Sequence, residues 1–241
     1  MEKMKEPAVQ CAQDESTEER SECAVEKRYT FGSYPQDGGR RNIDWLIIKE
    51  DDGRALLISE YVLDAKAFGM LGQNWESSNL RQWLNGEFLK RAFTPEQQAA
   101  LCKMRCSYFK LEKKEHVPQG ESEDKVTLLD VDTRQKYFGD QEELIAKATP
   151  YAQKRGVEIE DSADCCGWWL RAPLAALFEG VYAWTAYVTP NGLIFPMGIT
   201  NAAIGVRPVI EIDLGKAGGC QYDMVEDDEN ADDAIRGIED I

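Results

Sequence analysis

The chain has 241 residues, 43% of them hydrophobic, which is enough for one sizeable core but not for two full domains. Its formal net charge of −16 disfavours a nucleic acid as partner, because phosphate binding needs a basic face. No window of about eighteen apolar residues occurs, so no segment is expected to span a membrane.

The two ends of the chain are expected to be tails around a single domain at residues 29–214. Residues 1–28 are rich in charged and polar side chains and predict a flexible charged tail. They show no secretory signal, so we expect a cytoplasmic protein, with a mature extracellular form as the alternative. Residues 215–241 are Gly-rich and acidic, which predicts a disordered tail.

The domain is expected to open as antiparallel sheet. Alternating aromatic residues at 29–36 predict a strand that ends in a turn at Pro35 and the residues after it. Residues 43–48 and 55–59 are rich in β-branched and apolar side chains. The sequence Asp51-Asp52-Gly53 joins them and predicts a hairpin.

Helices are predicted next. Residues 75–86 have Ser and Asn to cap the start, an apolar stripe, and Gly86 to end the helix. Thr94-Pro95 predicts the start of a second helix that runs to about residue 102. Residues 108–123 are polar and predict a loop or an irregular sheet edge, and 126–130 predict a short ordered segment. Residues 141–148 are helix-like until Thr149-Pro150 ends them.

Two arginine-bearing segments, residues 168–173 and 205–210, read as buried strands. Their arginines should each find a carboxylate or several carbonyl groups, because an unpaired buried charge is costly. Between them, residues 182–189 and 193–195 predict a hairpin across a Pro-Asn-Gly turn. Pro208 cannot donate to a ladder, so its strand should be an edge or carry a bulge. The residues assigned to this structural framework are Trp168, Trp169, Arg171, Arg207, Trp83 and Arg81.

The seven cysteines are an odd number and do not predict a disulfide framework. Cys102 and Cys106, four residues apart, could lie on one face of a helix and bind a metal ion together with Cys165 and Cys166. The alternative is that all four are packed or incidental thiols. We expect this alternative, and we expect no cofactor. The single histidine, His116, excludes a His-rich metal site. A Ser-His-Asp triad would have to use it, but a surface loop is expected there.

Five signatures stand in order along the chain: FGSYPQ at 31–36, IDW at 43–45, WESSNLRQWLN at 75–85, WWLRAP at 168–173 and GVRP at 205–208. With them, residues 29–214 resemble a bacterial domain family of unknown function. The closing Gly-Val-Arg strand also resembles the C-type-lectin-like fold, in the branch of formylglycine-generating enzymes and the variable proteins of diversity-generating retroelements. The resemblance implies an α+β fold, with one twisted antiparallel sheet framed by two helices and a loop-rich second half.

In that branch of variable proteins the ligand surface lies between framework strands, which here corresponds to residues 172–204. This interval is rich in apolar and aromatic side chains, which suits a binding surface if it is exposed and a core if it is not. We expect a non-catalytic module that binds a protein or another macromolecule. The candidate ligand-binding residues are Leu174, Leu177, Phe178, Val181, Tyr182, Trp184 and Tyr187.

Two other functions stand beside this one. A scaffold would bind its partners through the acidic tails. An oxidative enzyme like the formylglycine-generating relatives would need a cysteine pair, and the adjacent Cys165 and Cys166 do not match such a pair in placement. Glu76, Arg81 and Glu211 would form an acid–base site or a structural ion-pair network.

Overall fold

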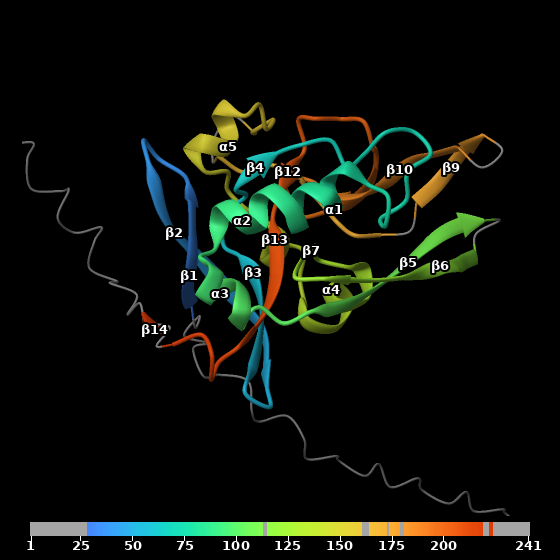
Figure 1. The fold of residues 1–241 in the computed structure, drawn as a ribbon. Helices are drawn as coiled ribbons and strands as arrows, with labels where there is room; N and C mark the ends of the chain where they lie inside the picture. The colour runs from blue at the N-terminus through green and yellow to red at the C-terminus, as the bar shows by residue number, and fades with distance from the viewer. Residues whose placement is uncertain are drawn as a thin grey trace, which may run out of the picture. The chain divides into compact units, whose positions relative to one another are not determined.

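The computed structural model describes residues 28–112, 115–160, 164–172, 174–178, 181–218 and 222–223. Only the backbone is described at residues 110–112, 115–116, 174–178, 181–182 and 222–223. The architecture is α+β, as predicted, with mostly antiparallel sheets and few helices. The single sheet that the resemblance implied is instead two sheets, and the second half is rich in strands (Figure 1).

The first sheet contains the predicted N-terminal hairpin. Its order is β14-β1-β2-β3-β13-β7, and every neighbouring pair is antiparallel. Asp52 and Gly53 both have positive φ, the conformation that a tight hairpin turn requires between β2 and β3. The strands are β1 (Arg28–Pro35), β2 (Arg40–Asp51), β3 (Arg54–Ser59), β7 (Val126–Leu128), β13 (Pro208–Asp213) and β14 (Tyr222–Asp223).

The second sheet has the order β4-β12-β8-β10-β9-β5-β6, with β11 paired to β10. Two of its pairs, β12 with β8 and β5 with β9, are parallel. The predicted hairpin after residue 181 is confirmed as β10 and β11. The strands are β4 (Asp64–Ala65), β5 (Met104–Glu112), β6 (Glu115–Asp124), β8 (Trp168–Trp169), β9 (Leu174–Phe178), β10 (Val181–Val188), β11 (Ile194–Gly198) and β12 (Gly205–Val206).

Of the two alternatives predicted for residues 108–123, the loop is wrong and the irregular sheet edge is the closer one. β5 and β6 form a long antiparallel hairpin with one register shift, and His116 lies on β6. Polar side chains of the hairpin pair across the two strands, as in the ion pairs Lys103–Glu123 at 3.1 Å and Arg105–Glu121 at 3.3 Å. Since β6 is the edge of its sheet, it does not need the apolar alternation of a half-buried strand.

The first predicted helix starts as expected but does not end at Gly86. Ser78 caps α1 (Asn79–Trp83), which continues through the π-helical turn η1 (Leu84–Phe88) into α2 (Leu89–Ala92). A buried stripe continues past the glycine, which explains the extra turns: Leu80, Leu84, Phe88 and Ala92. The segment packs against β1 and β7 (Figure 1). Thr94 forms the predicted capping box at the start of α3 (Pro95–Ala100).

Three short helices follow β7: α4 (Val131–Tyr137), the 3-10 helix η2 (Glu142–Leu144) and α5 (Pro150–Lys154). The helix predicted over residues 141–148 is therefore reduced to η2. Thr149 and Pro150 start a helix instead of ending one, because Thr149 accepts a hydrogen bond from Ala152 N and proline fits the first helical turn.

The prediction that Pro208 lies in an edge or bulged strand is wrong. Pro208 is the first residue of β13, and β13 lies between β3 and β7 in its sheet. The first position of a strand tolerates proline because the missing N–H is not needed there.

The core consists of two clusters that meet at β8. Trp169 belongs to the larger cluster and Trp168 to the smaller one, because successive side chains of a strand point to opposite faces. No helix in the described part of the chain is long and apolar enough to cross a membrane. Of the predicted tails, Arg28 begins β1, residues 215–218 follow β13, and residues 222–223 form β14 on β1; residues 1–27, 219–221 and 224–241 lie outside the described part of the chain.

Candidate functional site

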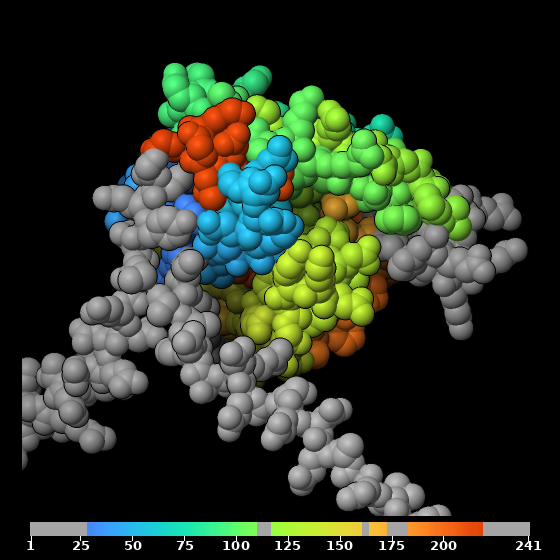
Figure 2. All heavy atoms as spheres, turned by 90° about the horizontal axis from the view of Figure 1, so that it is seen from below, coloured from blue at the N-terminus to red at the C-terminus, as the bar shows by residue number. Residues whose placement is uncertain are grey.

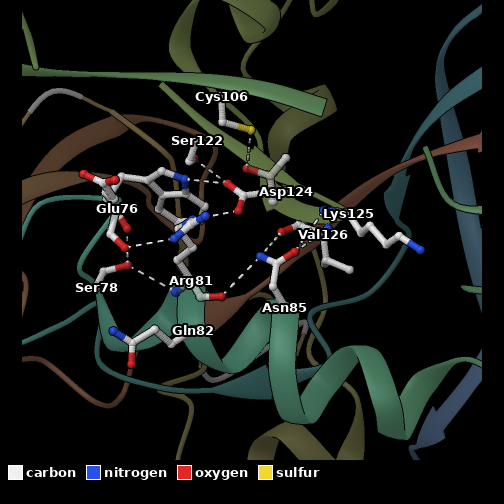
Figure 3. Close-up of polar contacts among 12 residues, drawn as sticks. Glu76, Ser78, Arg81, Gln82, Asn85, Cys106, Ser122, Asp124, Lys125 and Val126 are labelled. Carbon is white, nitrogen blue, oxygen red and sulfur yellow. Dashed lines mark hydrogen bonds and ion pairs between the residues drawn. The ribbon is translucent and has the colours of Figure 1, made fainter. Parts of the chain in front are cut away.

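The polar residues of the WESSNLRQWLN signature hold α1 and η1 against the end of β6 and the start of β7 (Figure 3). Arg81 Nε lies 2.7 Å from Oδ1 of Asp124, whose side chain is fully buried at the end of β6. Trp75 Nε1 and Ser122 Oγ donate to the other carboxylate oxygen at 3.0 and 2.7 Å. Asn85 Oδ1 accepts from the backbone N–H of Lys125 and Val126. These contacts place Arg81 in an ion pair between the helical segment and β6.

The proposed acid–base trio of Glu76, Arg81 and Glu211 is not assembled. Arg81 pairs with Asp124, whereas Glu211 pairs with Arg54 at 3.7 Å. Glu76 accepts a hydrogen bond from Tyr108. The trio therefore resolves into separate structural contacts.

The two framework arginines find different partners. Arg171 binds the carboxylate of Asp130 at 3.1 Å and the carbonyl of Ser107. Arg207 is only 1% exposed; its Nε donates to the carbonyl of Ser59 at 2.8 Å, and its guanidinium lies over the ring of Trp168. Burial lowers the pKa of Arg207 to about 10. The sequence predicts a carboxylate or several carbonyl groups as the partners of Arg207. The structure instead gives it one carbonyl group and an aromatic ring.

Trp168 and Trp169 are completely buried, and their indole N–H groups donate to the carbonyls of Leu144 and Lys66. Trp83 is half-buried, packs against Phe88 and carries Lys66 over its ring. These positions agree with framework roles for the three tryptophans.

The predicted binding residues lie on β9 and β10. β9 carries Leu174, Leu177 and Phe178, and β10 carries Val181 and Tyr182. Only the backbone of these five residues is described. Tyr187 is partly buried against the larger core cluster. Trp184 is 38% exposed. On β10, Trp184 is therefore partly at the surface, whereas Tyr187 is partly in the core.

The sequence reasoning missed three exposed apolar residues on the same hairpin, near the end of the ladder opposite to Trp184. Leu193, Ile194 and Phe195 of the β10–β11 hairpin are 40%, 37% and 52% exposed. A signal was present in the sequence, since no charged residue occurs between Glu179 and Arg207 although 30% of the chain is charged. We call the four exposed side chains, at residues 184 and 193–195, the hairpin surface.

The hairpin is held in place at its turn. Gly192 has φ +83°, and a Cβ there would lie 2.0 Å from the carbonyl oxygen of Gln141. Thr189 Oγ1 accepts from the N–H of Leu193, and Gly192 N–H donates to the carbonyl of Thr189. Only glycine permits so close an approach at this backbone angle. The surface is therefore presented on a fixed turn.

Cys102 and Cys106 do not form a pair on one helix face. Cys102 lies before β5, and Cys106 is buried on β5, where its Sγ donates to Thr127. Among the described residues no group of three or more His, Cys, Asp or Glu side chains is placed to hold a metal ion.

In the folded protein, iodoacetamide at pH 8 is expected to leave Cys106 and Cys166 unmodified. Burial raises the pKa of both thiols, that of Cys166 to about 12, so about one in ten thousand Cys166 side chains is a thiolate at pH 8. Peptide mass spectrometry measures the labelling, and guanidinium-unfolded protein provides the fully reactive control. Equal labelling of both samples would contradict the buried placement.

Comparison with known proteins gives one match. Residues 52–214 match the family described as Domain of unknown function (DUF6273). The chain matches no curated protein and no solved structure. The matched region covers more than half of the chain, from the β2–β3 turn to the residue after β13, and includes the hairpin surface. The chain belongs to the DUF6273 family, a domain of unknown function.

Proposed function

We propose that the protein is a non-catalytic ligand-binding module that recognises a macromolecular partner through the hairpin surface. The observation that carries this proposal is the group of four exposed apolar side chains on one hairpin without charged residues. The four belong to the two paired strands of one hairpin and the turn between them, and exposed apolar side chains of this kind are typical of interaction sites. The hairpin also has no acid, histidine or cysteine side chain, which suits recognition better than proton or group transfer.

Side-chain contact is the favoured mode of recognition. β11 pairs with β10 along one side, but Pro196 in its middle has no N–H group to offer to an added strand. A partner strand would therefore meet an interrupted ladder. Trp184 and Phe195 are the aromatic side chains of the surface, and aromatic residues dominate the binding energy of many interfaces.

Trp184→Ala and Phe195→Ser are expected to weaken partner binding at least tenfold without lowering the melting temperature. Phage-displayed peptides selected on the wild-type domain supply defined ligands, whose Kd is then measured by calorimetry against each variant. The matched control is Met70→Ser, which changes a 57% exposed apolar residue outside the hairpin and should leave Kd unchanged. Equal affinity for all variants would refute the proposal, and early melting would show the residues to be core.

The finer proposal concerns the origin of the surface. We propose a C-type-lectin-like module of the kind used as variable proteins by diversity-generating retroelements, with variation confined to residues 172–204. The support is the order of the signatures and the exposed side chains inside this interval. Close copies of the gene should then lie beside a reverse transcriptase and differ mainly within this interval. Copies that differ evenly along the domain would contradict it.

A further inference from the structure

A groove separate from the hairpin surface lies around Arg171. It consists of two adjoining cavities of about 280 and 300 Å³, which share Arg105, Asp130 and Arg171 in their walls. Figure 2 shows the hollow where the sky-blue β2–β3 hairpin, the green β5 and the yellow-green residues after β7 meet. Cavities of this size are at the lower end of the range for small-ligand sites. We call it the Arg171 groove.

The floor of the groove is a guanidinium that is already fixed in position. Arg171 Nη2 donates to Asp130 and its Nη1 to the carbonyl of Ser107, so the planar group is held from two walls. Its side chain is 11% exposed, and each of the two terminal nitrogens carries a second N–H. A preorganised guanidinium of this kind suits a planar carboxylate, since little freedom is lost on binding.

Asp130 offsets the charge of Arg171, so the preference for a carboxylate rests on directed hydrogen bonds from the guanidinium and not on a net positive charge. Both oxygens of Asp130 are occupied, by the N–H and hydroxyl of Thr133 and by Arg171. Glu211 is paired with Arg54. Asp132 is exposed at the mouth of the groove and is the acidic group that would oppose an anion.

Two further cations lie along the same wall. Arg105, Ser107 and Phe109 alternate on β5 and so share one face of the strand. Arg105 is 75% exposed, and its pair with Glu121 is of the exposed kind that contributes little. Lys103, also exposed, is paired with Glu123 and lines the second cavity. A carboxylate at Arg171 would therefore have a second arginine within the same groove.

Apolar side chains form part of both cavities. Phe109, Val131 and Ala172 line the first, and Leu56, Leu129 and Val209 line the second beside polar residues such as Thr127 and Thr133. These walls leave room for the apolar body of a ligand whose charged end lies on the arginines. We infer that the Arg171 groove binds a small carboxylate with an apolar body, either a free acid or the carboxyl terminus of a peptide.

The test uses N-acetyl-L-phenylalanine as the probe and its amide as the control. Isothermal calorimetry on the full chain should show saturable binding of the acid, and binding of the amide weaker by about tenfold or more, because the charge-assisted hydrogen bonds are lost. A longer acetylated peptide with the same terminus should bind more tightly if the occupant is a chain end and equally if it is a free acid. Absence of saturable binding of the acid, or equal binding of the amide, would overturn the inference.

Two charge variants at the mouth of the groove give opposite expectations. Arg105→Gln should weaken binding of the acid about tenfold, and Asp132→Asn should strengthen it, since both side chains are exposed and neither is in the core. A cationic or zwitterionic occupant would instead bind less tightly to Asp132→Asn, and that result would overturn the inference. Met70→Ser provides a surface control that should change neither value.

Discussion

Asp124→Ala is expected to lower the free energy of unfolding by about 3–5 kcal/mol, the usual cost of removing one partner from a buried ion pair. The carboxylate is fully buried and takes hydrogen bonds from Arg81, Trp75 and Ser122. Without it, a largely buried guanidinium and two buried donors lose their acceptor. Urea unfolding followed by circular dichroism measures the loss.

The neighbouring Glu123→Ala is the matched control. Glu123 is 64% exposed and pairs with Lys103 at the surface, so its loss should cost less than about 1 kcal/mol. Adding Arg81→Met to Asp124→Ala should restore part of the stability, because the unpaired cation is removed. A loss below 1 kcal/mol for Asp124→Ala would show that the cluster does not hold α1 to the sheet.

Gly32→Ala is expected to destabilise the domain by about 2–5 kcal/mol. Gly32 has φ +74° at the irregularity in the β1–β2 register, and left-handed backbone costs an L-residue about 1–2 kcal/mol. The added Cβ would also lie 2.5 Å from the ring of Phe93 and 2.9 Å from the carbonyl of Ala92. Such overpacking adds about 1–3 kcal/mol.

Gly38→Ala separates these two contributions. Gly38 has a similar φ of +62°, but no atom lies within 4 Å of its added Cβ. Only the backbone cost of about 1–2 kcal/mol is then expected. Equal losses for the two variants, measured by urea unfolding, would mean that Phe93 moves aside freely.

Local signals in the sequence predicted the structure where one short segment decides it. The caps at Ser78 and Thr94 and the turn at Asp52-Gly53 are of this kind, because their hydrogen bonds and backbone angles involve adjacent residues. The stop at Gly86 failed because the buried stripe on α1 and α2 outweighed the local cost of glycine.

The rest depends on contacts between distant residues. The polar sequence of β6 leaves both a loop and a sheet edge open, because its partners on β5 are not visible in its own sequence. The division into two sheets follows from pairings such as β13 with β3, far apart along the chain. Trp184 and Tyr187 are both predicted as binding residues, because the apolar composition of residues 172–204 does not separate the exposed Trp184 from Tyr187, which packs against the core. Only the packing of β10 makes that distinction.

The two adjacent tryptophans of β8 limit how the protein can be engineered. Each indole fills a different core cluster, and β10 pairs with this strand through Tyr187 and Val188. New side chains grafted onto the outward positions of the hairpin leave both clusters intact. If β10 shifted by one residue relative to β8, each of its side chains would move to the opposite face of the sheet, and its packing against both core clusters would be lost. The scaffold can thus tolerate many surface sequences but only one alignment of the strand that carries them.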